Sequence, residues 1–296
     1  MYYYHLSKTI LLRSMVALFL FSSLLVAQEI EKLKPIVSAE WLNKNLKNTN
    51  IRIIDLRDEN DFMKSHIQGA VNIPALKNLF GENFFMPPLE NLRILFSNAG
   101  IDSNTHVVAY DNGDFIWSAR LYWILQTLGH QKVSILDVGF SHQEIKKIPT
   151  TTVVTKTTKK EFVPRVDNSK LETKLGTLVS IGNKTIIDGR KTTHYDGIES
   201  KAQRYGHIPT ALNYACTQNY EVTKDGSKMK DLKTLAEVYK DIPKDKEIIL
   251  YCDGGAEAAL NYVVLQELGY KAAVYDGSWI EWGNDKNVPI KNPSNK

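Results

Sequence analysis

One pattern of strands and turns occurs twice along the chain, and this repeat limits the possible folds more than any other feature. The first copy has a β-branched run that ends in Asp55-x-Arg57, and the second has a similar run that ends in Asp188-x-Arg190. Four further matches follow in the same order: His66–Asn72 with His207–Asn213, His106–Asp111 with Glu247–Cys252, Leu125–Gly129 with Leu265–Gly269, and Ser134–Phe140 with Ala273–Trp279. Ordered matches of this kind predict two tandem copies of one domain.

Each copy is predicted to be an α/β domain with a mainly parallel sheet flanked by helices. The apolar runs Val107–Tyr110 and Ile248–Tyr251 are bounded by turn residues, which is typical of strands buried on both faces. Apolar residues from Ala258 to Leu268 then recur at helical spacing on one face, and Gly269 stands where a helix end is expected. We expect a signal peptide over 1–27, an N-terminal domain over 30–148, a linker over 149–168 and a C-terminal domain over 169–290.

The N-terminal stretch differs from the rest of the chain. Lys8 and Arg13 precede an uncharged apolar run from Met15 to Ala27, and no acidic residue occurs before Glu29. This arrangement is typical of a secretory signal peptide, and the run is shorter than the roughly 18 residues of a membrane span. We therefore expect an exported, periplasmic protein without stable membrane association after cleavage. An uncleaved anchor is the alternative, because Leu25 is large for its place before the cut.

The remaining composition narrows the possible partners. The net charge of +4 includes Lys8 and Arg13, so it falls to +2 once residues 1–27 are removed. No dense basic cluster with interleaved aromatic residues indicates nucleic-acid binding, and the run Lys156–Lys160 is interpreted as a solvated linker. The two cysteines, Cys216 and Cys252, are too few for a disulfide scaffold, which favours a working thiol. A single bridge between them is the alternative.

Cys252 is the candidate nucleophile. It directly follows a predicted buried strand, where ligands bind in parallel α/β sheets. Gly254 and Gly255 allow consecutive N–H groups to turn toward the sulfur, and the next helix presents its positive end. These donors should lower the pKa of the Cys252 thiol from about 8.5 and stabilise a persulfide. The alternative is a small buried cysteine that only fills space at the end of a strand.

Five motifs together resemble the tandem-domain rhodaneses, the thiosulfate and 3-mercaptopyruvate sulfurtransferases. These are Val37–Leu42, Asp55–Arg57, Gly206–Pro209, Cys252–Gly255 and Asp276–Trp282, and the resemblance runs from Val37 to Gly283. It implies transfer of a sulfane sulfur from thiosulfate or 3-mercaptopyruvate to cyanide or a thiol, through a persulfide on Cys252 and without a metal or organic cofactor. It also implies an inactive first copy, in which Asp111 stands at the position of the cysteine.

The resemblance implies a substrate-binding loop of Asp253, Gly254, Gly255, Ala256 and Glu257, which is one residue shorter than the loop after Asp111. It places Arg190 beside the sulfur pocket, where a fixed cation would bind an anionic donor. The alternative for Arg190 is a structural salt bridge with Asp188. Mercaptopyruvate-specific relatives often have a second arginine where this chain has His194. Because Asp253 and Glu257 would repel a doubly negative donor and raise the thiol pKa, we expect weak turnover of thiosulfate.

Two other functions are weighed against sulfur transfer. Cysteine-based phosphatases share the layout of strand, loop and helix, but they need an arginine at the end of the loop, where this chain has Glu257, Ala258 and Ala259. A non-catalytic module that binds a partner or a sulfur compound between the two copies stays open.

Several conspicuous residues are interpreted as structural. His66 and His207 occupy matching turns in both copies, and Trp279 and Trp282 are expected to pack the last connection. The acidic stretch that begins at Asp111 is only weak evidence of a metal loop.

Overall fold

A computed structural model describes residues 33–294 of the chain. Residues from Lys34 onward pack as one compact unit. The predicted signal peptide, residues 1–27, lies outside the described residues. Within residues 33–294, no helix combines the length and the apolar character needed to cross a membrane.

Each half of the described chain contains a five-stranded parallel sheet. The first sheet has the order β4 (Val71–Asn72), β2 (Ile51–Asp55), β5 (His106–Tyr110), β6 (Val133–Leu136) and β1 (Ile36–Val37). The second has the order β10 (Leu212–Asn213), β9 (Thr185–Asp188), β13 (Ile248–Tyr251), β14 (Ala272–Tyr275) and β8 (Leu171–Glu172). Strands at equivalent positions in the two sheets contain the sequence segments that match between the two copies. The predicted pair of α/β domains is therefore confirmed.

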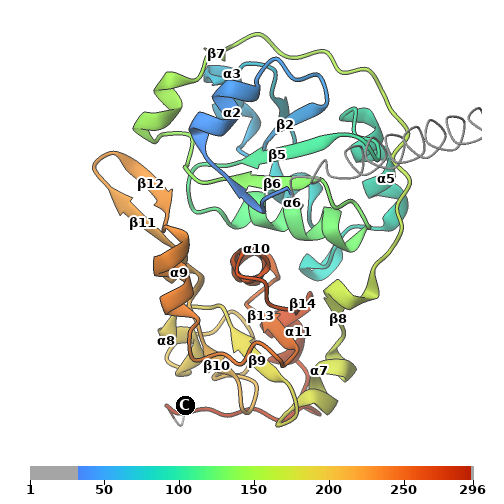
Figure 1. Ribbon diagram of the computed structural model, residues 1–296. Helices are drawn as coiled ribbons and strands as arrows, with labels where there is room; N and C mark the ends of the chain where they lie inside the picture. The colour runs from blue at the N-terminus through green and yellow to red at the C-terminus, as the bar shows by residue number, and fades with distance from the viewer. Residues whose placement is uncertain (1–32, 295–296) are drawn as a thin grey trace, which may run out of the picture. The chain divides into compact units, whose positions relative to one another are not determined.

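Helices cover both faces of each sheet (Figure 1). In the first half they are α2 (Ala39–Asn45), α3 (Glu59–Lys64), α4 (Ala75–Asn78), α5 (Leu89–Asn98) and α6 (Ile116–Thr127). In the second half they are α7 (Lys174–Ser180), α8 (Thr192–Tyr195), α9 (Leu232–Val238), α10 (Ala256–Glu267) and α11 (Ser278–Trp282). Successive residues of a strand enter different core clusters, as Ile53 and Ile54 do, because side chains alternate between the faces of a sheet.

The two halves share one hydrophobic core through α6 and α10. These helices contact each other, and Tyr122 of α6 lies against Tyr262 of α10 with ring centroids 6.2 Å apart. Every residue of α10 from Ala258 to Leu265 is buried, since its own sheet covers one side and α6 the other. The prediction of a single apolar face on α10 is therefore wrong, although Gly269 does follow the helix end with a φ of 81°.

In each half, the segment that follows the edge strand, β4 in the first sheet and β10 in the second, reaches the other half. In the second half this segment is the hairpin of β11 (Tyr220–Thr223) and β12 (Gly226–Met229). The Ser227 carbonyl accepts the N–H of Gly139 at 3.0 Å, and the Met229 N–H donates to the Asp137 carbonyl at 2.8 Å. In the first half, the Met86 N–H donates to the Asp276 carboxylate at 2.6 Å. Each half therefore helps to hold the loops of the other.

The segment predicted as a linker, residues 149–168, packs along the first half. Thr150–Thr151 forms β7 and pairs with β3 (His66–Ile67), and Phe162 is buried in the shared core. The Arg165 N–H donates to the Leu128 carbonyl at 2.8 Å. Lys156 and Lys159 are exposed, as expected for a solvated stretch.

The histidines and tryptophans interpreted as structural are buried. Nδ1 of His66 lies 2.8 Å from the Phe62 carbonyl and Nδ1 of His207 lies 2.7 Å from the Tyr195 carbonyl, and each imidazole stacks on the ring of that residue. Trp279 and Trp282 lie in the core cluster on the face of the second sheet opposite α10.

Candidate active site

Cys252 lies at the carboxyl end of β13, the central strand of the second sheet. Its backbone is fixed by the start of α11, because its N–H donates to Ser278 Oγ at 3.1 Å and its carbonyl accepts the Trp279 N–H at 2.9 Å. The Gly255 N–H donates to Cys252 Sγ at 3.0 Å, as the pair of glycines predicts. Gly255 has a φ of 83°, a conformation that favours glycine.

Burial decides the protonation of the Cys252 thiol. The residue is 1% exposed, and this desolvation raises the pKa of the thiol to about 12, with a further contribution from the negative charge of Glu257. The N–H groups of Ala258 and Gly254 act in the opposite direction. The expectation that the loop lowers this pKa is therefore wrong, because the donors are present but the loss of solvent outweighs them. At neutral pH the site holds a thiol and needs a base.

Glu257 is the carboxylate that acts most on this thiol. It lies in the first turn of α10, and burial raises the pKa of its own carboxyl group, as does the charge of Asp253. Among the described residues, none forms an ion pair or a hydrogen bond with its carboxylate. A carboxyl group with a raised pKa beside a buried thiol is suited to accept and return a proton.

Asp253, the other loop carboxylate, lies close to an imidazole, an ammonium group and a guanidinium group. Its Oδ2 lies 3.2 Å from Nδ1 of His194 and 3.2 Å from Nζ of Lys201, and its Oδ1 lies 3.7 Å from Nη1 of Arg190. The ion pairs with Lys201 and Arg190 offset part of the negative charge of Asp253, which still raises the pKa of the Cys252 thiol, as expected. Of the two loop carboxylates, Glu257 has the larger effect on the pKa of the Cys252 thiol.

Arg190 forms a structural ion pair with Asp188, as its alternative interpretation predicts. Its side chain is fully buried, its Nη2 lies 2.5 Å from Asp188 Oδ2, and it donates to the Gly206 carbonyl at 2.8 Å. Arg57 makes the same pair with Asp55, at 2.6 Å, in the half without a cysteine. The part of Arg190 directed at the loop is Nη1, which has no hydrogen-bond partner among the described residues and faces Asp253.

Phe84, from the first half, covers the cysteine loop. A Cβ atom built on Gly254 would lie 3.1 Å from Phe84 Cβ and 3.8 Å from Ile280 Cδ1, so the loop approaches both side chains closely. Asn83 and Phe84 have φ values of 52° and 65°, in the left-handed region that non-glycine residues rarely adopt. Such strain persists only where surrounding contacts hold it, and the ring of Phe84 remains half exposed.

Arg120, also from the first half, reaches the other glycine of the loop. A Cβ atom on Gly255 would lie 2.5 Å from Arg120 Nη1 and 2.8 Å from Asp276 Oδ1. These two groups form a buried ion pair of 2.5 Å between the halves. Gly255 is thus required both for its φ and for this close approach.

The loop after Asp111 keeps the shape of the cysteine loop without its chemistry. The Asp111 carboxylate accepts the N–H groups of Gly113, Phe115 and Ser118, and the Ser118 hydroxyl. Phe115 has a φ of 60° at the start of α6, where Gly255 stands before α10. As predicted, the second loop is one residue shorter, since α6 begins at residue 116 and α10 at residue 256. No group of three or more metal-ligating side chains occurs within residues 33–294.

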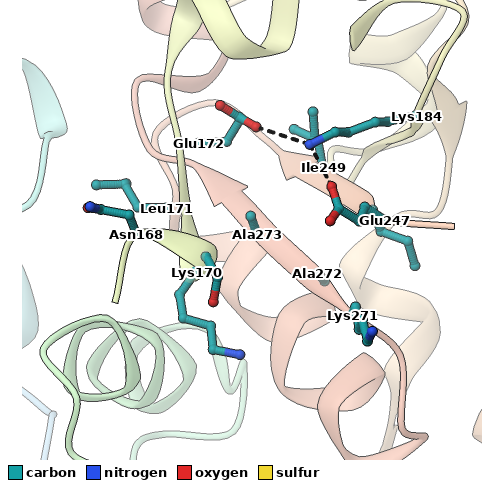
Figure 2. Close-up of a pocket in the computed structure, with 12 residues that line it drawn as sticks. Asn168, Lys170, Leu171, Glu172, Lys184, Glu247, Ile249, Lys271, Ala272 and Ala273 are labelled. Atoms are coloured by element: carbon teal, nitrogen blue, oxygen red, sulfur yellow. Dashed lines mark ion pairs between the residues drawn. The ribbon is translucent and has the colours of Figure 1, made fainter. Parts of the chain in front are cut away.

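A separate pocket of about 350 Å³ lies at the opposite end of the second sheet (Figure 2). It is lined by the first residues of β13 and β14, by β8, and by Lys184, whose ammonium group pairs with Glu247 at 2.7 Å and with Glu172 at 3.8 Å. Because Cys252 follows the carboxyl end of β13, this pocket is not part of the sulfur site.

Three residues around the cysteine loop are not identified by the sequence patterns: Phe84, Arg120 and Ser278. Two of them come from the first half, and contacts between copies leave no local pattern. Ser278 lies within the Asp276–Trp282 motif, so the motif itself was the signal. The alternative of a bridge between Cys216 and Cys252 is wrong for this structure, in which both cysteines are free.

Comparison with known proteins places both halves in one family. The model of the rhodanese-like domain matches residues 38–143 and 171–285. The 3-mercaptopyruvate sulfurtransferase of Escherichia coli K12 is 28% identical over 86% of this chain and 97% of its own length. The thiosulfate sulfurtransferase of Corynebacterium glutamicum is 28% identical over 88% and 91%. The crystal structure of SseA from Escherichia coli, described as a 3-mercaptopyruvate sulfotransferase with the rhodanese fold, superposes with a TM-score of 0.72 at 25% identity, over 83% of this chain and 99% of SseA.

Proposed function

The chain belongs to the rhodanese family as a tandem-domain sulfurtransferase, and we propose that it carries the transferred sulfur as a persulfide on Cys252. The observation that carries this proposal is the Gly255 N–H directed at Cys252 Sγ, within a loop whose backbone N–H groups oppose the effect of burial. The same groups would stabilise negative charge on a bound persulfide. The chemistry uses the thiol itself and calls for no metal or organic cofactor.

Glu257 supplies the proton transfer in the proposed reaction. It accepts the proton of the Cys252 thiol, and the thiolate then attacks the sulfur of the donor. With 3-mercaptopyruvate a bond forms between the two sulfurs and the carbon–sulfur bond breaks. The leaving pyruvate enolate takes the proton back at carbon. Cyanide or an external thiol then removes the terminal sulfur from the persulfide and regenerates the cysteine.

The charge distribution favours 3-mercaptopyruvate over thiosulfate. Thiosulfate brings two negative charges toward the unmatched carboxylate of Glu257, whereas 3-mercaptopyruvate brings one. Lys201, beside Asp253, supplies positive charge for the donor carboxylate, and Nη1 of Arg190, which makes no hydrogen bond with a described residue, faces the same loop. The substrate roles of Arg190, Asp253, Gly254, Gly255, Ala256 and Glu257 belong to this proposal.

Turnover of the two donors with cyanide tests the proposed function. We expect measurable thiocyanate formation with 3-mercaptopyruvate, a lower kcat/KM with thiosulfate, and none with either donor in Cys252→Ser. Cys216→Ala is the matched control, since it removes the other thiol and should retain turnover with cyanide. Equal turnover in Cys252→Ser and the unchanged protein would disprove the role of Cys252.

One observation favours a second function, a non-catalytic module that binds a partner or a sulfur compound. Cys252 is 1% exposed, so a donor must displace part of its cover before it reaches the sulfur. The module would bind 3-mercaptopyruvate in a calorimeter yet release no pyruvate. A sulfurtransferase must both bind 3-mercaptopyruvate and release pyruvate.

Export is proposed from residues 1–27 alone. When the full chain is expressed in a bacterium with a periplasm, we expect the mature protein to begin at Gln28 and to be released with the periplasmic fraction. A protein that begins at Met1 and sediments with membranes would instead support the uncleaved anchor.

A further inference from the structure

The second cysteine of the chain lies beside the loop of the first. The Cys216 N–H donates to the Gly189 carbonyl at 2.9 Å, and the Gly189 N–H donates to the carbonyl of Tyr251, the residue before Cys252, at 2.8 Å. A Cβ atom on Gly189 would also lie 3.5 Å from the N atom of Ala258, whose N–H acts on the Cys252 sulfur. Two backbone hydrogen bonds thus link residue 216 to the strand that ends at Cys252.

The two side chains share one environment. Cys216 and Cys252 are both buried, both free, and members of the same core cluster. Burial raises the pKa of the Cys216 thiol, and negative charge on Glu257 and on Cys252 raises it further. Glu257 is also the charge that acts most on Cys252. The negative charge of Glu257 therefore acts on both thiols.

The first half supplies an internal comparison. The offset of 141 that pairs Asn72 with Asn213 also pairs Ala75 with Cys216. Ala75 occupies the same place, since its N–H donates to the Leu56 carbonyl at 3.2 Å beside the Asp111 loop. The fold therefore accepts an alanine here, and a thiol stands at this place only in the half that has Cys252.

We propose that Cys216 is an internal acceptor for the sulfur carried by Cys252. Its thiolate attacks the Cys252 sulfur of the persulfide, a Cys216–Cys252 disulfide forms, and the terminal sulfur leaves as hydrosulfide. The bond between Cys252 and the terminal sulfur breaks as the bond between the two cysteine sulfurs forms. The terminal sulfur is reduced to sulfide and the two cysteine sulfurs are oxidised to the disulfide.

The protons balance within the site. Glu257 accepts the proton of the Cys216 thiol and returns it to the leaving hydrosulfide. A dithiol reductant outside the protein must then reduce the disulfide before another donor is used. The overall reaction is release of hydrogen sulfide at the expense of a dithiol, an activity distinct from transfer to cyanide. This inference rests on the proposed persulfide.

The test loads the full chain with 3-mercaptopyruvate, without oxygen and without an acceptor. Intact mass, free thiols and released sulfide are measured on the same sample. The unchanged protein should release sulfide, lose both of its two thiols and retain no added sulfur. Dithiothreitol should restore both thiols. Cys216→Ala should retain one added sulfur atom and release no sulfide. Because Ala75 fills the matching place in the first half, this variant should fold, which a thermal melt checks.

Two results separate this inference from the proposed function. If the unchanged protein retains the added sulfur and releases no sulfide, Cys216 is not an acceptor, while the persulfide on Cys252 stands. If neither the unchanged protein nor Cys216→Ala gains sulfur or releases pyruvate, the proposed function fails and the inference fails with it.

Discussion

The sulfur of Cys252 is subject to two opposed influences. Backbone N–H groups of its loop favour the thiolate, whereas burial and the charge of Glu257 favour the thiol. The pKa of about 12 means that burial prevails in the resting protein. The protonated thiol is unreactive toward sulfur donors, and activation requires a change in the charge or hydration around Glu257.

Replacement of Glu257 by Gln should make Cys252 more reactive at neutral pH. Loss of the negative charge lowers the pKa of the thiol, and each unit of that decrease raises the thiolate fraction about tenfold. In a Cys216→Ala background, alkylation by iodoacetamide should rise with pH up to about pH 12, and Glu257→Gln should shift this curve to lower pH.

Glu199→Gln is the matched control for that experiment. Glu199 is exposed and pairs with His194 at 3.3 Å, but it does not figure among the charges that shift the pKa of Cys252. An unshifted alkylation curve in Glu257→Gln, or an equal shift in Glu199→Gln, would contradict the role given to Glu257.

At the scale of single residues, the sequence predicts where the candidate nucleophile lies but not its protonation. The strand before Cys252 and the glycines after it are local patterns, and they predicted a sulfur surrounded by backbone donors. The burial that raises the pKa depends on the packing of the whole fold, in which side chains distant in the sequence, such as Phe84, lie against Gly254 of the loop. A local sequence pattern does not indicate how deeply the thiol is buried from solvent.

Among the elements, the segment between α4 and α5 lies against the cysteine loop. Phe84 lies on Gly254 with its ring half exposed, and its φ of 65° is a strained conformation. A pocket of about 600 Å³, lined in part by Phe85, Lys174 and Ile280, adjoins this cover. The side chain nearest to solvent over the loop is thus also held in an unfavourable backbone conformation.

Truncation of Phe84 to Ala should open the loop. We expect the rate of Cys252 alkylation at pH 8 to increase several-fold, because less apolar surface must move before a reagent reaches the sulfur. Phe85→Ala serves as the control, since Phe85 has similar exposure but does not approach Gly254. Equal rates in the two variants would show that Phe84 does not limit access.

The repeat predicted most of the elements, since strand and helix spacings recur within each copy. It did not predict the hairpin β11–β12 or the reciprocal segment around Met86. These segments differ between the copies, and their hydrogen-bond partners, such as Gly139 and Asp276, lie in the opposite half. Contacts of this kind have no periodicity from which to infer them.

In the whole molecule, the half without a cysteine completes the site of the other half. Arg120 of α6 pairs with Asp276 and fits against Gly255, and α6 also buries one side of α10. Removal of one member of a buried ion pair leaves an uncompensated charge, at a cost of about 3–5 kcal/mol.

Arg120→Ala should therefore lower the free energy of unfolding by about 3–5 kcal/mol, as measured by urea denaturation. The double variant Arg120→Met with Asp276→Asn should recover part of this loss, because it removes both charges. Arg93→Ala is the control, since its pair with Glu90 is exposed to solvent and should contribute little to stability. Equal losses in Arg120→Ala and Arg93→Ala would contradict a stabilising contact between the halves.

Retention of sulfur by Cys252 is the claim on which the account depends, and intact mass measures it most directly. After exposure of the Cys216→Ala protein to 3-mercaptopyruvate and removal of excess donor, the account predicts a gain of one sulfur atom that cyanide removes. The same protein with Cys252→Ser should gain nothing. An unchanged mass in the first protein, or an equal gain in the second, would contradict the assignment of Cys252 as the sulfur carrier.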